Sequence, residues 1–415
     1  MNKKEVSEIK RRIKKEDCSF TRLCGCYVNS NKEKVVTFDG PFWDIEEEAK
    51  FKYVEIANKA LSGKVGNNLV ELEYTLESET EGDAHKMLMG LRECKLTNQD
   101  LVNAFYDHVI ETYNKTENYL IILFHDVYDI PVKTTDGMKL DDSVEMYEYI
   151  ICAICPVALS KAGLGYNTDE QNIAMVKRNW IVGPVETAFT FPCFTDRSTD
   201  IHSILTYTKD VKNPHHEFWE NGLGAINALT STEKRNAFTD IVKNEFVGDE
   251  DEDAENAVIS IAGGINSAIK AQEAKGIDEP VYLGRDKMQE ILEESGIDVD
   301  KAKKIGEGYE NFFDADIPDA YELIDEKSIR ESEIRNERKN FMKEISDLNE
   351  KNKHLMEITD PVEYGDSDNE KVILRVSEDK AEKIRTTTLD GVECLVIPLM
   401  ENEETIINGK TVKLS

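Results

Sequence analysis

The sequence has little positive charge and no long apolar run. Its 415 residues include 51 Lys and Arg against 83 Asp and Glu, which gives a formal net charge of −32. The longest nearly apolar stretch, Tyr149–Leu159, contains Pro156 and is too short to cross a bilayer. The first residues lack the apolar segment of a signal peptide. We therefore expect a cytoplasmic protein without membrane contact, and we do not expect free nucleic acid as a ligand, because so acidic a chain repels phosphates.

Motifs typical of a cofactor site or a known catalytic centre are also missing. The sequence has no phosphate-binding loop, nucleophile elbow or zinc-protease helix, and Gly163-Leu164-Gly165 lacks the third glycine of a dinucleotide-binding turn. Eight cysteines are scattered along the chain. Cys152 and Cys155 lie in a predicted strand, where positions three apart face opposite sides. Without a second pair of ligands at suitable spacing, we predict reduced structural thiols, no structural zinc and no cofactor.

Strand and helix patterns alternate along the rest of the chain. Residues 70–77 alternate between apolar and mostly acidic side chains, which is typical of a half-buried strand. Residues 120–127 begin as a continuous apolar run and open into polar residues, which suits a central strand. Residues 44–61 and 98–113 repeat apolar side chains at helical spacing. The predicted fold class is α+β, with a mixed or antiparallel sheet and helices, then a helical region, then a small C-terminal antiparallel β meander with turns at Asp390-Gly391 and Asn408-Gly409.

A run of acidic residues suggests where the domains divide. Five acidic residues follow one another from Asp249 to Asp253, and their mutual repulsion disfavours compact structure. We interpret residues 249–255 as a linker. The predicted parts are then an α+β core domain at 1–248, a helical region at 256–357 and a β meander at 358–415.

The helical region ends in a long charged helix, predicted over residues 325–357. Two interpretations of this helix stay open: a surface helix packed on its own domain, or a coiled coil. Its apolar residues at seven-residue spacing favour the coiled coil, and the polar residues at the intervening core positions argue against it. The first set is Ile334, Phe341, Leu348 and Leu355, and the second is Arg338 and Asn352.

The polar segment 194–202 is the first candidate for chemistry. It brings Asp196, Arg197, Asp200 and His202 together at a strand boundary, where functional sites collect. If the strand begins at Asp200, then Asp200 and His202 share a face, and a histidine oriented by a carboxylate is the minimal arrangement for a general base. The alternative is a structural loop with an Asp–Arg pair and an Asx turn.

His125 and Asp126 form the second candidate, because they lie where the apolar strand pattern ends. The alternative is a packed histidine with no chemical role. A hydrolase or nuclease, with or without a divalent cation, requires His125 or Asp126 to meet Asp200 and His202 in one cavity.

The N-terminal segment concentrates positive charge in an otherwise acidic chain. Val6, Ile9 and Ile13 recur at helical spacing, which predicts a basic amphipathic helix. We expect this segment to be a docking element and not part of the core; the alternative is that it folds back onto the acidic surface. The predicted docking residues are Lys10, Arg11, Arg12, Lys14 and Lys15, with Lys3 and Lys4 nearby.

Four segments resemble those of one protein family. They are MNKKEVSEIKRRIKKEDCSFTRLCGCYV, YLIILFHDVYDIPVKTTDGMKLDDS, YEYIICAICPVALSKAGLGY and FPCFTDRSTDIHSILTYTKD. The family consists of cytoplasmic proteins of about this length from low-GC Gram-positive anaerobes, which share a full-length domain of unknown function. The resemblance is strongest over residues 1–220. It implies family membership and no activity, so no catalytic residue is carried over.

Three functions are compatible with these observations. The first is an intracellular interaction or regulatory protein with a protein partner and without catalysis. The second is the hydrolase or nuclease described above. The third is a factor that docks on the translation machinery through its basic N-terminal helix. The sequence does not determine the oligomeric state.

Overall fold

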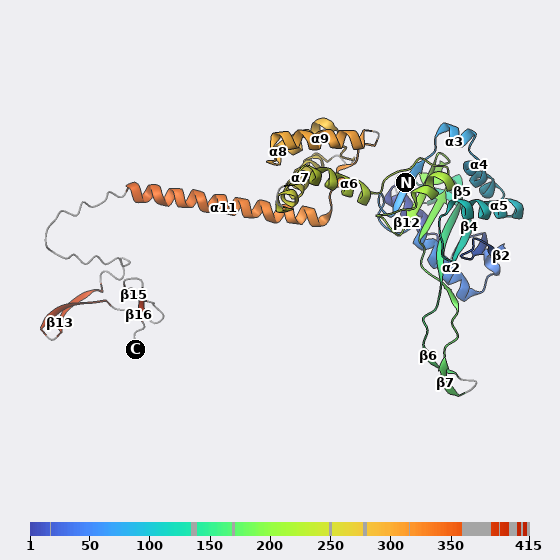
Figure 1. The fold of residues 1–415 in the computed structure, drawn as a ribbon, viewed down its shortest axis with the longest axis horizontal. Coiled ribbons are helices and arrows are strands. Elements are labelled where there is room, and N and C mark those ends of the chain that lie inside the picture. The colour runs from blue at the N-terminus through green and yellow to red at the C-terminus, as the bar shows by residue number, and fades with distance from the viewer. Residues whose placement is uncertain are drawn as a thin grey trace. The chain divides into compact units, whose positions relative to one another are not determined.

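An antiparallel sheet forms the main element of the fold (Figure 1). The computed structural model describes residues 1–16, 18–133, 139–167, 171–248, 251–276, 280–314, 316–358, 383–389, 391–397, 405–407 and 410–412. The strands of the sheet, in spatial order, are β2 (Lys34–Pro41), β1 (Arg22–Val28), β4 (Tyr119–Lys133), β5 (Lys139–Leu159), β9 (Thr187–Phe191), β12 (Ser203–Thr208) and β3 (Leu69–Glu73); β8 (Trp180–Val182) pairs with the end of β5. The predicted α+β class is confirmed.

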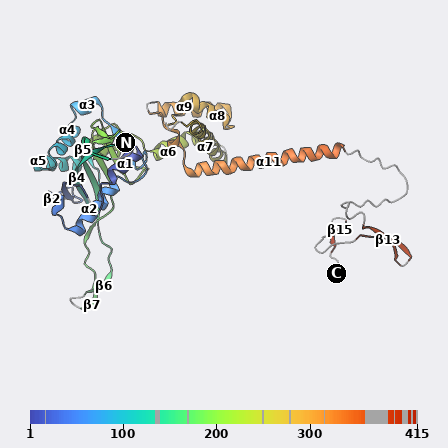
Figure 2. The same cartoon turned by 180° about the vertical axis from the view of Figure 1, so that it is seen from behind.

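Helices cover both faces of this sheet (Figure 2). The first face carries α1 (Lys3–Lys10) and α2 (Glu47–Ala60), and the second carries α4 (Asp83–Glu93), α5 (Gln99–Thr112) and the π-helix η2 (Phe218–Gly222). In β4, Leu120, Ile122 and Phe124 pack on the first face, whereas Ile121 and Leu123 pack on the second. Because successive strand residues face opposite sides, a continuous apolar run fills both layers. The short helices η1 (Phe42–Asp44) and α3 (Leu76–Thr80) lie in connections.

The cysteines of the sheet follow the same alternation. Cys152 packs on the second face and Cys155 on the first, so the prediction that they face opposite sides is confirmed. Cys24 and Cys26 share the second face, and burial raises the pKa of each thiol to about 11. These two cysteines are therefore neutral thiols at physiological pH.

A hairpin arm projects from the sheet between β5 and β8 (Figure 1). It consists of β6 (Leu164–Asn167) and β7 (Asn172–Met175). Leu164 pairs with Met175, and Tyr166 pairs with Ile173. Paired residues share a face, and these four side chains are between 62% and 71% exposed. One face of the arm is therefore apolar and open to solvent.

A helical part follows the sheet and has a core of its own. Its members are α6 (Ser231–Asn244), α7 (Asp251–Glu273), α8 (Arg285–Glu294), α9 (Val299–Phe313), α10 (Ala320–Leu323) and the beginning of α11 (Glu326–Ile358). Phe238 and Val242 of α6 lie in this core. The helical part therefore begins at α6, earlier than the predicted boundary at residue 256.

The predicted acidic linker is wrong for residues 251–255, because they belong to α7. Glu252 and Asp253 lie in the first turn of that helix, where the positive end of the helix dipole stabilises carboxylates. Helix formation thus places the acidic run where its charge is favourable. The chain divides instead inside α11, into the units Met1–Phe341 and Met342–Ser415.

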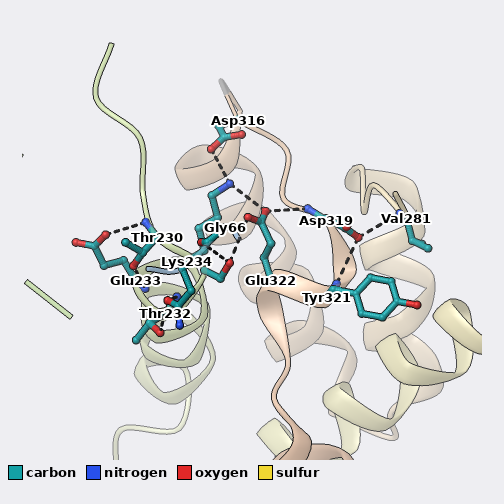
Figure 3. Close-up of polar contacts among 12 residues, drawn as sticks. Gly66, Thr230, Thr232, Glu233, Lys234, Val281, Asp316, Asp319, Tyr321 and Glu322 are labelled. Atoms are coloured by element: carbon teal, nitrogen blue, oxygen red, sulfur yellow. Dashed lines mark hydrogen bonds and ion pairs between the residues drawn. The ribbon is translucent and has the colours of Figure 1, made fainter. Parts of the chain in front are cut away.

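Hydrogen bonds join the start of α6 to the loop before β3 (Figure 3). The Ser231 hydroxyl donates to the Gly66 carbonyl at 2.6 Å, and the Thr232 hydroxyl donates to Asn67 Oδ1 at 2.8 Å. Gly66 has a φ of 81°, a conformation that a side chain would strain. Further along α6, Lys234 binds Glu322 of α10 and Asp316.

The C-terminal unit contains two separate antiparallel pairs among its described residues, where a single meander was predicted. β13 (Arg385–Leu389) pairs with β14 (Val392–Val396), and β15 (Thr405–Ile407) pairs with β16 (Lys410–Val412). Gly391 has a φ of 85°, as a tight hairpin turn requires. Asp390 and the predicted turn Asn408-Gly409 lie outside the described residues. No helix within the described ranges has the length and apolar character needed to cross a membrane.

Candidate functional site

Helix α1 is a folded part of the first sheet face. Asn2 caps it and forms a capping box with Glu5, which fixes the start of the helix. Val6 and Ile9 of the helix, and Ile13 just beyond its end, are buried in the core of this first face. The expectation that the N-terminus is not a core element is therefore wrong: the spacing that predicted the helix also packs one side of it.

The opposite side of α1 lines a cavity of about 860 Å³. Five cationic and two anionic side chains surround it, so the local charge is opposite to that of the whole chain. The lining residues are Lys3, Lys4, Ser7, Glu8, Arg11, Arg12 and Lys14 from the N-terminal segment, and Tyr128, Asp129 and Pro131 from β4. Clustered cations in one concavity raise the local concentration of anions.

The predicted docking residues divide between the cavity and its surroundings. Arg11, Arg12 and Lys14 line the cavity, whereas Lys10 and Lys15 do not. Lys15 pairs with Glu55 at 2.6 Å. Burial lowers the pKa of Lys10, and the nearby charge of Lys59 lowers it further. Only part of the basic segment thus presents its charge to the cavity.

Arg12 is held rigidly at the wall of the cavity. Its guanidinium lies 4.2 Å from the centre of the Tyr128 ring and donates to the Val127 carbonyl at 2.9 Å. It also lies 3.5 Å from the buried carboxylate of Asp126. Its Nε is buried and has no hydrogen-bond partner among the described residues.

Glu8 connects the cavity to the candidate loop. Its Oε1 accepts hydrogen bonds from the Tyr128 hydroxyl at 2.8 Å and from Arg197 Nη2 at 3.1 Å. Arg197 also donates to the Pro131 carbonyl at 3.1 Å. Burial raises the pKa of Tyr128, and the hydrogen bond to Glu8 raises it further. Arg197 therefore reaches the wall of the basic cavity.

The loop after Phe194 is a tight hairpin between β10 (Cys193–Thr195) and β11 (Ser198–Asp200). Asp196 and Arg197 form its turn with φ values of 51° and 59°, which is the pattern of a type I′ turn. The Asp196 amide donates to Glu5 Oε1 at 2.9 Å. The turn is thus fixed by α1, and Arg197 pairs with Glu8 where the structural interpretation expected an Asp–Arg pair.

Asp200 and His202 do not share a strand, which corrects the assumption behind the general-base hypothesis. Asp200 ends β11, whereas β12 begins at Ser203. Asp200 Oδ1 accepts from the His202 backbone amide at 3.0 Å, which is an Asx turn. The exposed His202 ring instead lies 2.8 Å from Glu79, whose hydrogen bond raises the pKa of the histidine.

His125 and Asp126 are fully buried, on opposite faces of β4. His125 is hydrogen-bonded to Thr21 and Glu148, and burial lowers its pKa. Asp126 Oδ2 accepts from the Tyr149 hydroxyl at 2.6 Å and from Ser19 at 2.9 Å. Neither side chain is positioned to reach a substrate together with His202.

A smaller cavity of about 270 Å³ lies beside His215 and His216. His215 Nε2 lies 3.4 Å from Glu186, to which Lys115 donates at 2.7 Å. His216 binds Glu233 at 2.7 Å instead. The two adjacent histidines therefore point toward different partners. Among the described residues, no group of three or more His, Cys, Asp or Glu could hold a metal ion.

The sequence did not indicate that Tyr128 and Pro131 line the cavity. No local pattern shows that the end of one strand lies beside a helix that is distant in the sequence. Ser7 and Glu8 could have been included, since they lie one turn from Lys4 and Arg11 on the same helix.

The family model described as Domain of unknown function (DUF4317) matches residues 1–410. No curated protein and no solved structure matches the chain.

Proposed function

Because this chain belongs to the DUF4317 family, a domain of unknown function, we propose a function from its geometry: it is an interaction protein that binds an acidic segment of a partner protein in the cavity beside α1. The observation that carries this proposal is the gathering of five cations around one cavity in a chain of net charge −32. We also propose that the protein is bacterial and lies in the cytoplasm, as expected from the sequence.

The lining of the cavity suits a segment that is both acidic and partly apolar. The mobile ammonium groups of Lys3, Lys4 and Lys14 can pair with carboxylates at several positions. Arg12 is already engaged by Tyr128 and Asp126, so it contributes a fixed positive wall. Pro131 and the lysine stems add apolar surface.

An acidic peptide fits better than a nucleic acid because of the charge around the cavity. A polynucleotide longer than the cavity carries its phosphates over a surface of strongly negative net charge, which repels them. A short acidic segment places its charge only at the cations. Docking on an RNA-rich partner such as the translation machinery is therefore the alternative, and the binding experiment described below distinguishes it from a protein partner.

The hydrolase or nuclease hypothesis receives less support from the geometry. His202 is oriented by Glu79 and not by Asp200, and His125 is fully buried. A general base needs access to its substrate. Asp196 and Arg197 are used to build a turn.

The proposal is tested by fluorescence anisotropy with a labelled peptide of alternating Glu and Leu. We expect saturable binding that weakens as salt is added. The variant Lys3→Glu/Arg11→Glu should bind roughly tenfold more weakly, because two attractive charges become repulsive. The matched control is Lys15→Ala, which removes a positive charge from the same segment but outside the cavity, and should bind as the wild type does.

A labelled single-stranded RNA of equal length is the competing probe. If the RNA binds more tightly than the peptide, and its binding is weakened in the same way by Lys3→Glu/Arg11→Glu, the partner is a nucleic acid and not a protein. Binding of neither probe, or equal loss in Lys15→Ala, would overturn the proposal.

A further inference from the structure

Among the residues whose side chains are described, those in the first turns of helix α11 pack on its own domain. Arg335 donates to the Asn256 carbonyl of α7 at 2.9 Å, and Glu333 pairs with Lys270 of α7 at 2.8 Å. Ser332 is buried against α7 at Gly263, which is a position where an added Cβ would overlap the Ser332 hydroxyl. The absence of a side chain at Gly263 therefore permits this close approach of the two helices.

The following part of α11 exposes its large apolar side chains. Phe341 and Met342 are each 65% exposed, Ile345 is 54% exposed and Leu348 is 53% exposed. Ile334 is 64% exposed although it lies beside the packed turns. Ile334 follows Ser332 by two residues, or about 200° around the helix, so it faces away from α7. The exposed stripe therefore begins on the side of α11 opposite to its contact with α7.

The exposed residues follow a heptad pattern. Ile334, Phe341 and Leu348 occupy d positions, and Arg338 and Ile345 occupy a positions. The sequence continues this register with Asn352 at a and Leu355 at d. A stripe of two residues in seven is narrower than the face that a helix presents to a globular core, and it is the width of a coiled-coil seam.

We propose that this part of α11 forms a parallel, in-register coiled coil with α11 of a second copy of the chain. The polar a positions decide the choice of partner and direction. In a parallel pair each a residue meets the same residue of its copy, and a polar residue such as Asn352, which the sequence places at a, specifies that register. In an antiparallel pair a meets d, and all four d positions are apolar. Asn352 and Arg338 would then lack polar partners.

The flanking charges fit the same arrangement. Arg338 at a meets Arg338 of the copy, and each guanidinium also lies next to the g residue of the copy, Glu337, whose carboxylate offsets the repulsion between the two cations. The e positions Met342, Asn349 and Met356 carry no charge. Pairs of like charge between g and e positions of the two copies therefore do not arise over these heptads. Ile345 at a and Leu348 at d are the combination that favours two strands.

Sedimentation equilibrium of the full chain tests the proposal. We expect twice the chain mass in the micromolar range. Ile345→Glu/Leu348→Glu should give the mass of one chain, with a dissociation constant raised by roughly a hundredfold or more. The thermal midpoint of the folded domains should not change, because both side chains are exposed. Lys343→Glu, at the outer f position, is the matched control and should remain dimeric.

Cysteine crosslinking tests the direction of the helices. Leu348→Cys should form a disulfide-linked dimer under mild oxidation, whereas Lys343→Cys and the wild type should not. A monomeric wild-type chain, or a dimer that survives Ile345→Glu/Leu348→Glu, would overturn the proposal. A dimer without the crosslink at position 348 would exclude the parallel register. Lys3→Glu/Arg11→Glu should leave the mass unchanged, so this result is independent of the basic cavity.

Discussion

The Lys234 ammonium on α6 donates to Glu322 Oε2 on α10 at 3.0 Å. The same ammonium lies 2.9 Å from Asp316 (Figure 3). Burial lowers the pKa of Lys234, but the hydrogen bonds and charges of Asp316 and Glu322 outweigh burial and raise the pKa overall. This one side chain therefore holds two segments of the helical part that are far apart in the sequence.

Replacing Lys234 should destabilise the helical part. In Lys234→Met, Glu322 keeps its negative charge in a half-buried position but loses its cation, so we expect a loss of about 1–3 kcal/mol in the free energy of unfolding. Urea unfolding followed by circular dichroism measures it. Lys327→Met removes an exposed lysine and should cost less than about 0.5 kcal/mol. Equal losses in both variants would show that the buried ion pair has no special importance.

The two sides of α1 should respond differently to truncation. Ile9 is fully buried, so Ile9→Ala should cost about 2–4 kcal/mol through lost apolar contact and a residual cavity. Arg11→Ala should cost less than about 0.5 kcal/mol, because Arg11 is exposed. Thermal unfolding measures both. If Ile9→Ala leaves the melting temperature unchanged, α1 is not a core element and the structural assignment fails.

Replacing Asp126 should lower the free energy of unfolding more than replacing Asp200. Asp126 is fully buried and accepts hydrogen bonds from Tyr149 and Ser19, so Asp126→Ala leaves the buried Tyr149 hydroxyl and the half-buried Ser19 hydroxyl without this partner and should cost about 3–5 kcal/mol. Asp200→Ala removes the turn hydrogen bond from the His202 amide and a long one from the Thr195 hydroxyl at 3.4 Å, and should cost about 1–2 kcal/mol. Chemical denaturation gives both values. A larger loss at Asp200 would contradict this ranking.

The Glu186 carboxylate should make stability depend on acid pH. The hydrogen bond from His215 lowers its pKa most, burial opposes this, and Lys115 lowers the pKa further, to about 2 from an ordinary 4.5. A carboxyl with a lowered folded pKa stabilises the fold above its unfolded pKa and loses that effect as pH falls toward the folded pKa. After allowance for solvent screening, we expect about 1–2 kcal/mol.

The measurement for Glu186 is the difference in unfolding free energy between the wild type and Glu186→Gln. We expect it to be largest above about pH 5 and to shrink as pH falls from about 4.5 toward 2. Because both proteins share every other carboxyl group, their common acid sensitivity cancels. A difference that stays constant over this range would show that Glu186 titrates normally.

The sequence by itself determined the elements whose signal repeats within a few residues. The apolar run at Leu120–Phe124 predicted a strand that is buried on both faces, and β4 is such a strand. The spacing of Val6, Ile9 and Ile13 predicted α1, and the separation of Cys152 from Cys155 predicted their opposite faces. These inferences hold because side-chain direction follows from the helical and strand repeats alone.

Only the tertiary structure decided what these elements meet. Glu8 binds Arg197, which lies 189 residues further along the chain, and no local pattern encodes that contact. The strand break between Asp200 and Ser203 separates the two residues that spacing alone placed on one face. The acidic run beginning at Asp249 was predicted to be a linker from its repulsion, but packing of α7 and the helix dipole outweigh that repulsion from Asp251 onward. Contacts between distant segments depend on which surfaces pack together, and that is a property of the whole fold.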